Sequence, residues 1–329
     1  MAKGTNQKLK LLYLAQIFSE ETDEDHGLTL AEIAQRLSRL DINAERKTLY
    51  QDFEELRRFG MDICTNQEGK SFRYFLGSRT FQLPELKLLV DAVQSSRFIT
   101  EQKSRELIKK LETLTSRSNA NQLQRQVLIA GRIKTMNESI YYNVDGLHTA
   151  IAKERQIQFR YFRWGPDKTM ILRHNGELYT VSPWHLCWDD ENYYLVAYDS
   201  ASGRIKHYRV DKMKNITITD LPRDGAETME HLDLTIYTRR LFGMFGGEPI
   251  RVTLEGDDDM INVLIDRFGD EIPLSRKDGD RVETRVDVAV SPQFLGWVAS
   301  FGGKLTVTSP PSVKEQMRAL ARKLSEQYE

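Results

Sequence analysis

Cysteine is scarce in this sequence, with only Cys64 and Cys187 among 329 residues. The two lie far apart, and neither stands near a second cysteine or a spaced pair of histidines. The sequence therefore predicts neither a disulfide framework nor a structural zinc site. Long apolar runs are also missing, since no stretch approaches the roughly 18 residues needed to cross a bilayer. The first ten residues, MAKGTNQKLK, lack the apolar segment of a secretory signal. We expect a cytoplasmic protein that binds no metal and no membrane.

Neither sign of charge predominates. Lys and Arg total 47 and Asp and Glu total 48, which gives a net charge of -1. This balance argues against a uniformly basic nucleic-acid coat and against a membrane-surface protein, but it allows a local basic patch. With 40% apolar and 29% charged residues, the composition is typical of a soluble protein. The length predicts about two domains and permits three.

The common catalytic signatures are absent: there is no H-E-x-x-H, no G-x-S-x-G and no phosphate-binding loop. The run Gly302–Leu305 has the glycines and lysine of such a loop but not the hydroxyl that binds magnesium, so we interpret it as a turn into a strand. The run Asp257–Asp259 lacks the alternating ligands of a calcium loop and is expected to begin a helix. His185, Cys187 and Asp189 alternate near one strand without identifiable oxyanion donors. We assign no catalytic residue, no metal and no cofactor.

Three helices are predicted in the first 60 residues. The first carries an apolar stripe at helical spacing, broken by an acidic stretch from Glu20 to Asp25. The second begins at Thr29, which forms a T-x-x-E capping box with Glu32. The third extends to about Arg58. The stripe of the first helix is Leu9, Leu12, Tyr13, Gln16 and Ile17, and that of the third is Leu49, Phe53 and Leu56.

Two short strands are predicted after these helices, Ile63 to Thr65 and Ser71 to Leu76, joined by the turn-prone run 66–70. This order is that of a winged helix-turn-helix, which binds DNA by placing the second helix of the pair in the major groove. An alternative interpretation is a solvated helix face in an interaction domain. The candidate DNA-contacting residues of the helix are Arg46, Lys47, Thr48, Tyr50 and Gln51, and those of the wing, reaching phosphates, are Lys70 and Arg73.

Residues 80 to about 140 are predicted to form two or three helices. Pro84 stands where a first-turn proline is tolerated. The apolar stripes are Leu86, Leu89, Val90 and Val93, then Leu107, Ile108, Leu111 and Leu114. Because these helices are too few to close a core, we expect them to connect the DNA module to the rest of the chain and to contribute a dimer contact.

From Arg155 to Ile218 the apolar pattern has a period of two, with polar turns between short strands. This pattern predicts a small antiparallel sheet or barrel. The stretch is rich in aromatic residues together with Arg and His, which suits stacking of a base or binding of a phosphate. An aromatic core with charged residues reaching solvent is the alternative. After Leu221 the expected order βαββαβ is that of a ferredoxin-like fold, followed by a last helix at Val313 to Tyr328.

Several of these segments resemble one known family. AERKTLYQDFEELRRFGMDI is similar to the recognition helix of the DeoR-like winged helices that begin WYL-domain transcriptional regulators. In PWHLCWDDENYYLVAYD, Tyr193-Tyr194-Leu195 stands where the family has Trp-Tyr-Leu, and IKHYRVDKM resembles its second motif. FGDEI and SPQFLGWVASFGGKLTVTSPPSV resemble the C-terminal extension, WCX, of these proteins.

The resemblance implies a homodimer that binds double-stranded DNA and whose WYL domain, a small Sm-like or SH3-like barrel, senses a nucleotide or oligonucleotide. The residues that it places in the ligand pocket are Tyr161, Trp184, His185, Tyr194, His207 and Arg209. Among them Arg209 is the foremost phosphate ligand, because its fork of donors fits a phosphate. Gln51 departs from the arginine of many relatives, and glutamine can instead read adenine.

The expected fold is therefore a multidomain α+β protein. Its predicted parts are a winged helix-turn-helix at 1–79, a helical linker at 80–140, a WYL ligand-sensing domain at 141–221 and a ferredoxin-like WCX extension at 222–329. The favoured function is a ligand-responsive transcriptional regulator. Two alternatives are a nucleic-acid-binding accessory protein of defence or DNA-damage response without strong sequence preference, and an enzyme acting on nucleotides through His185 or His207.

Overall fold

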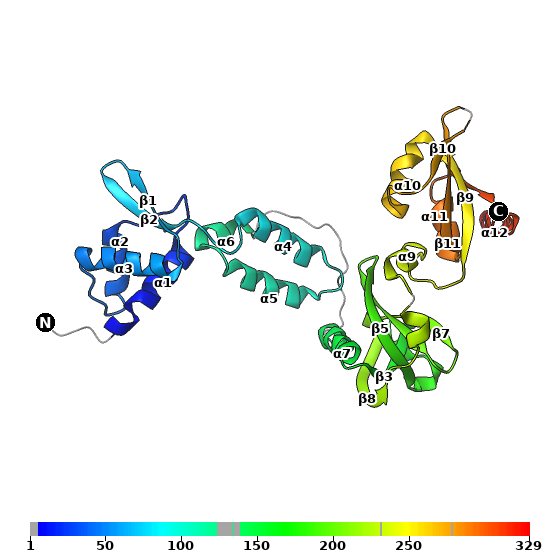
Figure 1. Ribbon diagram of the computed structural model, residues 1–329, viewed down its shortest axis with the longest axis horizontal. Helices are drawn as coiled ribbons and strands as arrows, with labels where there is room; N and C mark the ends of the chain where they lie inside the picture. Colours follow the sequence, from blue (N-terminus) through cyan, green and yellow to red (C-terminus); the bar gives the residue numbers. More distant parts are fainter. Residues whose placement is uncertain (1–5, 124–133, 135–138, 231, 278) are drawn as a thin grey trace. The chain divides into compact units, whose positions relative to one another are not determined.

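The computed structural model describes residues 6–123, 134, 139–230, 232–277 and 279–329. The chain forms two compact units, Met1–Met136 and Asn137–Glu329. It is a mixed α/β protein whose described residues form sheets of two, four and six strands (Figure 1).

The first unit begins with three helices, α1 Lys10–Glu21, α2 Leu30–Ser38 and α3 Arg46–Phe59, and a short 3-10 turn at Gln7–Leu9 precedes them. The capping box that opens α2 is confirmed, because Thr29 accepts a hydrogen bond from the Glu32 amide and the Glu32 side chain accepts one from the Thr29 amide. Helix α3 ends at Gly60, whose φ of 107° lies in the left-handed region that suits glycine.

The apolar stripe of α3 is confirmed, since Leu49, Phe53 and Leu56 are all buried. The stripe predicted for the first helix is confirmed at Ile17 but wrong at Leu12, which is 68% exposed. The buried face carries Lys10, Leu14 and Phe18 beside Ile17. The physical reason is the Lys10 ammonium, which pairs with Asp52 of α3 and so lies on the inward face.

A hairpin follows, formed by β1 Ile63–Glu68 and β2 Ser71–Leu76 in antiparallel pairing. The first strand, β1, extends three residues further toward the turn than the sequence predicted. The turn can be this short because Gly69, with a φ of 62°, permits a tight reversal. Leu28, just before α2, exchanges backbone hydrogen bonds of 2.9 and 2.8 Å with Tyr74. The hairpin is thereby fixed to the helices.

Helices α4 Leu83–Ser95, α5 Glu101–Glu112 and α6 Arg117–Leu123 complete the described part of this unit, and α4 and α5 lie side by side (Figure 1). Pro84 lies in the first turn of α4, as predicted. Leu86, Val90 and Leu123 form a small core, whereas Leu89 is 38% exposed. Residues 124–133 and 135–138 of the predicted linker lie outside the described residues.

Ion pairs and hydrogen bonds join these helices to the three-helix segment. Ser116 donates a hydrogen bond to Asp23, and Arg117 pairs with Glu20 at 2.6 Å. Burial opposes ionisation of Asp23, but the hydrogen bonds from Ser116 and His26 outweigh it and lower the pKa of its carboxyl group. The acidic stretch predicted as a helix breaker is thus also a contact surface inside the first unit.

The second unit opens with α7 Ile140–Ala152 and a six-stranded antiparallel sheet. The strands are β3 Arg155–Trp164, β4 Met170–Leu172, β5 Tyr179–Asp189, β6 Asn192–Asp199, β7 Arg204–Arg209 and β8 Met213–Pro222. Their order is β4-β3-β5-β6-β7, with β8 also paired to β3. The sheet curls around Ile157, Phe159 and Leu195, and α7 packs against it.

The sheet is a curled half-barrel, where the sequence pattern allowed a small antiparallel sheet or barrel and the family resemblance implied a barrel. A 3-10 turn at Val210–Lys212 lies between β7 and β8, and within residues 139–230 no backbone ladder joins those two strands. After this turn the chain continues as β8, which pairs with β3 in antiparallel orientation.

Two short helices that the sequence pattern did not predict follow, α8 Ala226–Met229 and α9 Leu234–Arg239. The chain then forms β9 Pro249–Asp257, a 3-10 turn Asp258–Met260, α10 Ile261–Phe268, β10 Leu274–Arg276, β11 Arg281–Ala289, α11 Pro292–Ala299, β12 Leu305–Ser309 and α12 Pro311–Tyr328. The four strands have the order β10-β11-β9-β12 and are antiparallel. The predicted succession of strands and helices is confirmed.

The segment that joins the two sheets of this unit is held to the second of them. The Ala289 amide of β11 donates to the Arg240 carbonyl at 2.8 Å, and Arg267 of α10 donates to the Leu241 carbonyl. The side chain of Phe242 is part of the core formed by β9, β11 and α11. Residues 240–242 therefore belong structurally to the C-terminal sheet.

Candidate functional site

The exposed face of α3 carries all five of its candidate DNA-contacting residues. Leu49 and Phe53 are buried, and this fixes the opposite face toward solvent. Lys47 and Gln51, one helical turn apart, form no hydrogen bond or ion pair within the described part of the chain. Lys70, at the tip of the hairpin, is exposed as well. These side chains are available to a partner molecule.

Arg46 and Tyr50 are held in place by the hairpin. Arg46 donates to the Tyr50 hydroxyl at 3.4 Å, and the Tyr74 hydroxyl of β2 donates to the same oxygen at 3.5 Å. Burial and this hydrogen bond raise the pKa of Tyr74 to about 12. A groove of about 450 Å³ beside these residues is lined by α2, α3 and the hairpin, and Lys70 and Phe72 are among its lining residues.

Thr48 and Arg73 are used inside the fold. The Thr48 hydroxyl donates to the Glu45 carbonyl at 2.8 Å and accepts from Lys10 at 3.1 Å. Arg73 donates to the Gly27 carbonyl at 2.9 Å and pairs with Glu68 and Glu32. The guanidinium group that was expected to reach phosphates therefore ties the hairpin to the start of α2.

The residues expected in the ligand pocket divide between two cavities. Tyr161, Tyr194, His207 and Arg209 line one cavity of about 1050 Å³ on the curled sheet. Trp184 and His185 line a separate cavity of about 620 Å³. The pairing of β5 with β6 shifts register between Pro183 and His185, so simple alternation along β5 does not place these two side chains with the others.

Arg209 is bound within the protein. Its Nε and Nη2 atoms donate to the two Asp211 oxygens at 3.0 and 2.9 Å, and Nη2 also donates to Asn192 at 2.7 Å. Burial opposes its charge, but the hydrogen bonds to Asp211 outweigh burial and raise the pKa of the guanidinium group. Its backbone amide donates to the Tyr161 hydroxyl at 3.0 Å, and burial raises the pKa of Tyr161 to about 12.

His207 is neutral at pH 7, because burial lowers its pKa to about 4. Its Nε2 atom lies 3.2 Å from the Tyr237 hydroxyl of α9. This contact brings the segment after the curled sheet to the wall of the larger cavity.

The larger cavity contains five cations besides Arg209, and the sequence pattern did not indicate them. Six basic side chains line it: Arg163, Arg173, Arg204, Lys206, Arg209 and Lys212. Lys206 pairs with Asp199 and Arg209 with Asp211. Within the described residues the other four have no carboxylate partner. Burial, Arg209 and Arg173 together lower the pKa of Lys212. The cavity wall therefore has an excess of positive charge.

The sequence indicated only some of the residues that line the larger cavity. Arg173 and Lys212 lie away from the centres of the two WYL-like motifs. Tyr237 and Phe245 come from a segment whose apolar residues show neither helical nor strand spacing. Only the fold of β3, β7 and the segment 237–249 brings them together.

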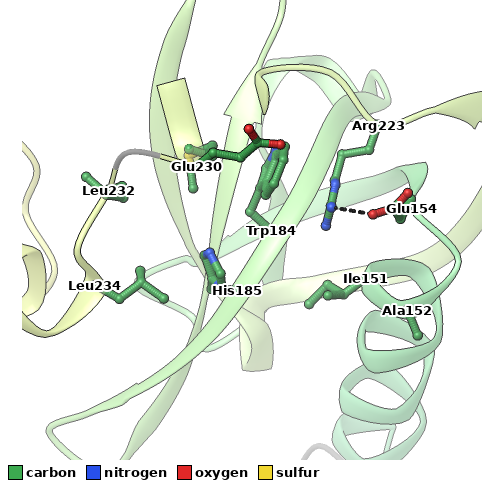
Figure 2. Close-up of a pocket in the computed structure, with 10 residues that line it drawn as sticks. Ile151, Ala152, Glu154, Trp184, His185, Arg223, Glu230, Leu232 and Leu234 are labelled. Carbon is green, nitrogen blue, oxygen red and sulfur yellow. Dashed lines mark hydrogen bonds and ion pairs between the residues drawn. The ribbon is translucent and has the colours of Figure 1, made fainter. Parts of the chain in front are cut away.

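The smaller cavity has a different chemistry. Arg223 stacks on the Trp184 ring at 3.6 Å and pairs with Glu154 at 3.0 Å, as Figure 2 shows. The Trp184 Nε1 atom donates to the Asp224 carbonyl at 2.8 Å. Burial and then the nearby Arg223 lower the pKa of His185. Because Trp184 and Arg223 are engaged with each other, this cavity offers fewer uncommitted groups than the larger one.

The set His185, Cys187 and Asp189 has no features of an activated nucleophile. Burial raises the pKa of the Cys187 thiol, and burial also raises the pKa of the Asp189 carboxyl group. Across the described residues, no three His, Cys, Asp or Glu side chains gather in a way that would hold a metal ion. No helix in those same ranges is long and apolar enough to cross a membrane.

Comparisons with known families identify two domains. The WYL domain matches residues 143–218, and the WCX domain matches residues 248–325. The chain therefore contains a WYL and a WCX domain, as the sequence motifs predicted. A comparison with curated proteins yields no match.

Two solved structures are similar to this chain over 99% of its length. One is the proteasome accessory factor B/C (PafBC) of Arthrobacter aurescens, with 17% identity and a TM-score of 0.29. The other is a CRISPR Cas-related protein, with 12% identity, a TM-score of 0.38 and 92% of its own chain covered. This chain spans 50% of the length of the PafBC chain.

Proposed function

We propose that this protein is a ligand-responsive regulator of transcription that binds double-stranded DNA. The observation that carries the proposal is the exposed face of α3, where Lys47 and Gln51 are without partners inside the described chain, next to a hairpin that presents Lys70. In this proposal residues 1–79 are a winged helix-turn-helix, and α3 enters the major groove. Lysine suits guanine acceptors there, and glutamine suits the adenine edge.

The proposed assembly is a homodimer that presents two copies of α3 to a pseudo-palindromic site. Residues 80–140 then form the linker and dimer contact, 141–221 the ligand-sensing domain and 222–329 a ferredoxin-like extension. The strand order β10-β11-β9-β12 supports that last assignment. The protein is proposed to act in the cytoplasm and to catalyse no reaction.

The ligand in this proposal is a nucleotide or oligonucleotide in the larger cavity. Four cations without carboxylate partners in the described chain and a wall of aromatic rings support it, since phosphates bind the cations and bases stack on rings. The Arg209 guanidinium is held by Asp211, and its backbone amide positions the Tyr161 hydroxyl in the cavity wall. Regulation requires that the ligand bind the DNA-competent and incompetent states with different affinity.

The DNA-binding proposal is tested with Lys47→Ala/Gln51→Ala. The probe is a duplex selected by the unmodified protein from random DNA, and binding is measured by fluorescence anisotropy. Each base contact is worth about 1–3 kcal/mol, so the double variant should bind at least about tenfold more weakly. Lys323→Ala/Gln327→Ala on α12 is the matched control, because it removes the same two exposed residue types at the same helical spacing. Equal affinity of the unmodified protein and the α3 variant would overturn the proposal.

A second candidate function is a nucleic-acid-binding accessory protein without strong sequence preference. The excess of cations around the cavity favours it, because such a surface binds phosphates of any sequence. A salt titration against the selected and a random duplex separates the two functions. A phosphate-driven mode gives the same affinity and the same steep salt dependence for both duplexes, whereas a regulator binds the selected duplex more tightly at every salt concentration.

A further inference from the structure

One acidic residue lines the larger cavity among its many cations. Of the described residues that form the wall, Glu248 is the only carboxylate, against six Arg and Lys side chains. An acidic group in a phosphate-binding cavity weakens the attraction for phosphate, because like charges repel. Glu248 is therefore not a phosphate ligand of this cavity.

Glu248 is exposed and does not neutralise the neighbouring cations. Lys206 and Arg209 pair with Asp199 and Asp211, and no ion pair joins Glu248 to any described Lys or Arg. Its carboxylate oxygens are therefore free to accept hydrogen bonds from a bound molecule.

The backbone on both sides of Glu248 is well anchored. The strap Gly243–Pro249 begins beside Phe242, which is packed in the C-terminal core, and ends where Pro249 pairs with Ala289 at the start of β9. Gly243 has a φ of 60°, and Gly246 lies so close to His207 that an added Cβ would be 3.4 Å from the imidazole ring. The strap therefore follows the cavity wall closely and carries Glu248 with it.

An aromatic ring on the same strap is also exposed. Phe245 is 50% exposed and lines the cavity three residues before Glu248. An exposed ring beside an unpaired acceptor is the combination that holds a base by stacking and reads its edge by hydrogen bonds.

We propose that Glu248 recognises a guanine base in an oligonucleotide bound in this cavity, with Phe245 stacking on the base and the cations binding the phosphates. This inference rests on the proposed oligonucleotide ligand. Guanine presents two adjacent donors, N1–H and N2–H2, which match the two oxygens of one carboxylate. Thymine presents one donor between two carbonyl oxygens, and those oxygens repel the carboxylate. Adenine and cytosine place a single amino group beside an acceptor.

The experiment uses the full chain and two single-stranded DNA hexamers, each with a 5′-phosphate and a 3′-fluorescein. One is all thymine, and the other has guanine at its third position. Fluorescence anisotropy should show about tenfold tighter binding of the guanine hexamer, the discrimination expected of one bidentate base contact. Glu248→Gln should reduce this ratio to near one, because an amide replaces one acceptor oxygen with a donor. Glu177→Gln changes an exposed carboxylate outside the cavity and should retain the ratio.

The outcomes separate this inference from the proposed ligand site. Arg173→Ala/Lys212→Ala removes two cavity cations and should weaken binding of both hexamers equally. If that variant weakens binding but the unmodified protein binds both hexamers alike, the guanine assignment fails and the ligand site stands. The assignment also fails if Glu248→Gln retains the preference. If neither hexamer binds, or if binding ignores the cavity cations, the oligonucleotide site and the guanine assignment fail together.

Discussion

His207 shows how burial determines the charge of one side chain. It lies against Tyr237 and Gly246, and its pKa of about 4 keeps it neutral in the folded protein at pH 7. In the unfolded chain an imidazole titrates near 6.5. Between these two pKa values the unfolded state binds more protons, so the stability associated with neutral His207 is complete above about pH 6.5 and is lost as the pH falls toward 4.

We therefore predict that lowering the pH from 7 to 5 reduces the free energy of unfolding of the second unit by about 1–2 kcal/mol through this residue. Urea unfolding at the two pH values measures the effect. His207→Gln keeps a hydrogen-bonding partner for Tyr237 but does not titrate, so its pH-dependent loss should be smaller by that amount. The same loss in both proteins would show that His207 is not responsible.

For single residues, the sequence predicted which side chains line the larger cavity better than it predicted their hydrogen-bond partners. Tyr161, Tyr194, His207 and Arg209 were expected together and do line one cavity. Arg209 was expected to be free to bind a phosphate, but its guanidinium group is bound by Asp211 and Asn192. The sequence could not show this, because only the turn after β7 and the pairing of β6 with β7 bring these partners to it.

The contact of the hairpin with the start of α2 depends on a glycine. A Cβ at Gly27 would lie 2.8 Å from the Arg73 Cβ and 3.5 Å from the Tyr74 carbonyl oxygen. Leu28 and Tyr74 are joined by two backbone hydrogen bonds at the same place, so the chains cannot separate without breaking them.

Gly27→Ala should therefore lower the free energy of unfolding of the first unit by about 1–3 kcal/mol through overpacking. Gly146→Ala in α7 provides the contrast, because an added Cβ there meets nothing within 4 Å and the backbone is helical. That change should stabilise the second unit by about 0.5–1 kcal/mol. Urea titration of each variant provides the measurement, and a Gly27→Ala protein as stable as the original would contradict the predicted clash.

For the helices, the local sequence predicted where a helix begins better than it predicted which face of the helix is buried. The Thr29 capping box marked the start of α2 because the cap is a contact within four residues. The inward face of α1 was misjudged because it includes Lys10, whose burial depends on Asp52, 42 positions away in the chain. Helices α8 and α9 are too short to show a periodic pattern.

Among the residues that the structure describes, each hydrophobic core belongs to one unit or the other. The described clusters around Phe53 and around Leu86 draw only on the first unit, and those around Phe159, Met244 and Phe294 draw only on the second. Cooperative unfolding follows shared cores, so the two units should unfold as separate transitions.

Differential scanning calorimetry of the full chain tests this expectation. Gly27→Ala should lower the temperature of one transition and leave the other in place, whereas Gly146→Ala should raise the temperature of the other alone. If either substitution shifts both transitions together, the two units unfold as one.

The cavity on the curled sheet has a consequence for the order in which the protein is made. Its cations come from residues 163–212, whereas Tyr237 and the strap that carries Glu248 come later in the chain. Translation proceeds from the N-terminus, and domains generally fold as they emerge. A nascent chain thus completes helix α3 first, then the residues that carry the cavity's cations, and only then Tyr237 and the strap. During each round of synthesis, the first unit therefore exists before this cavity does.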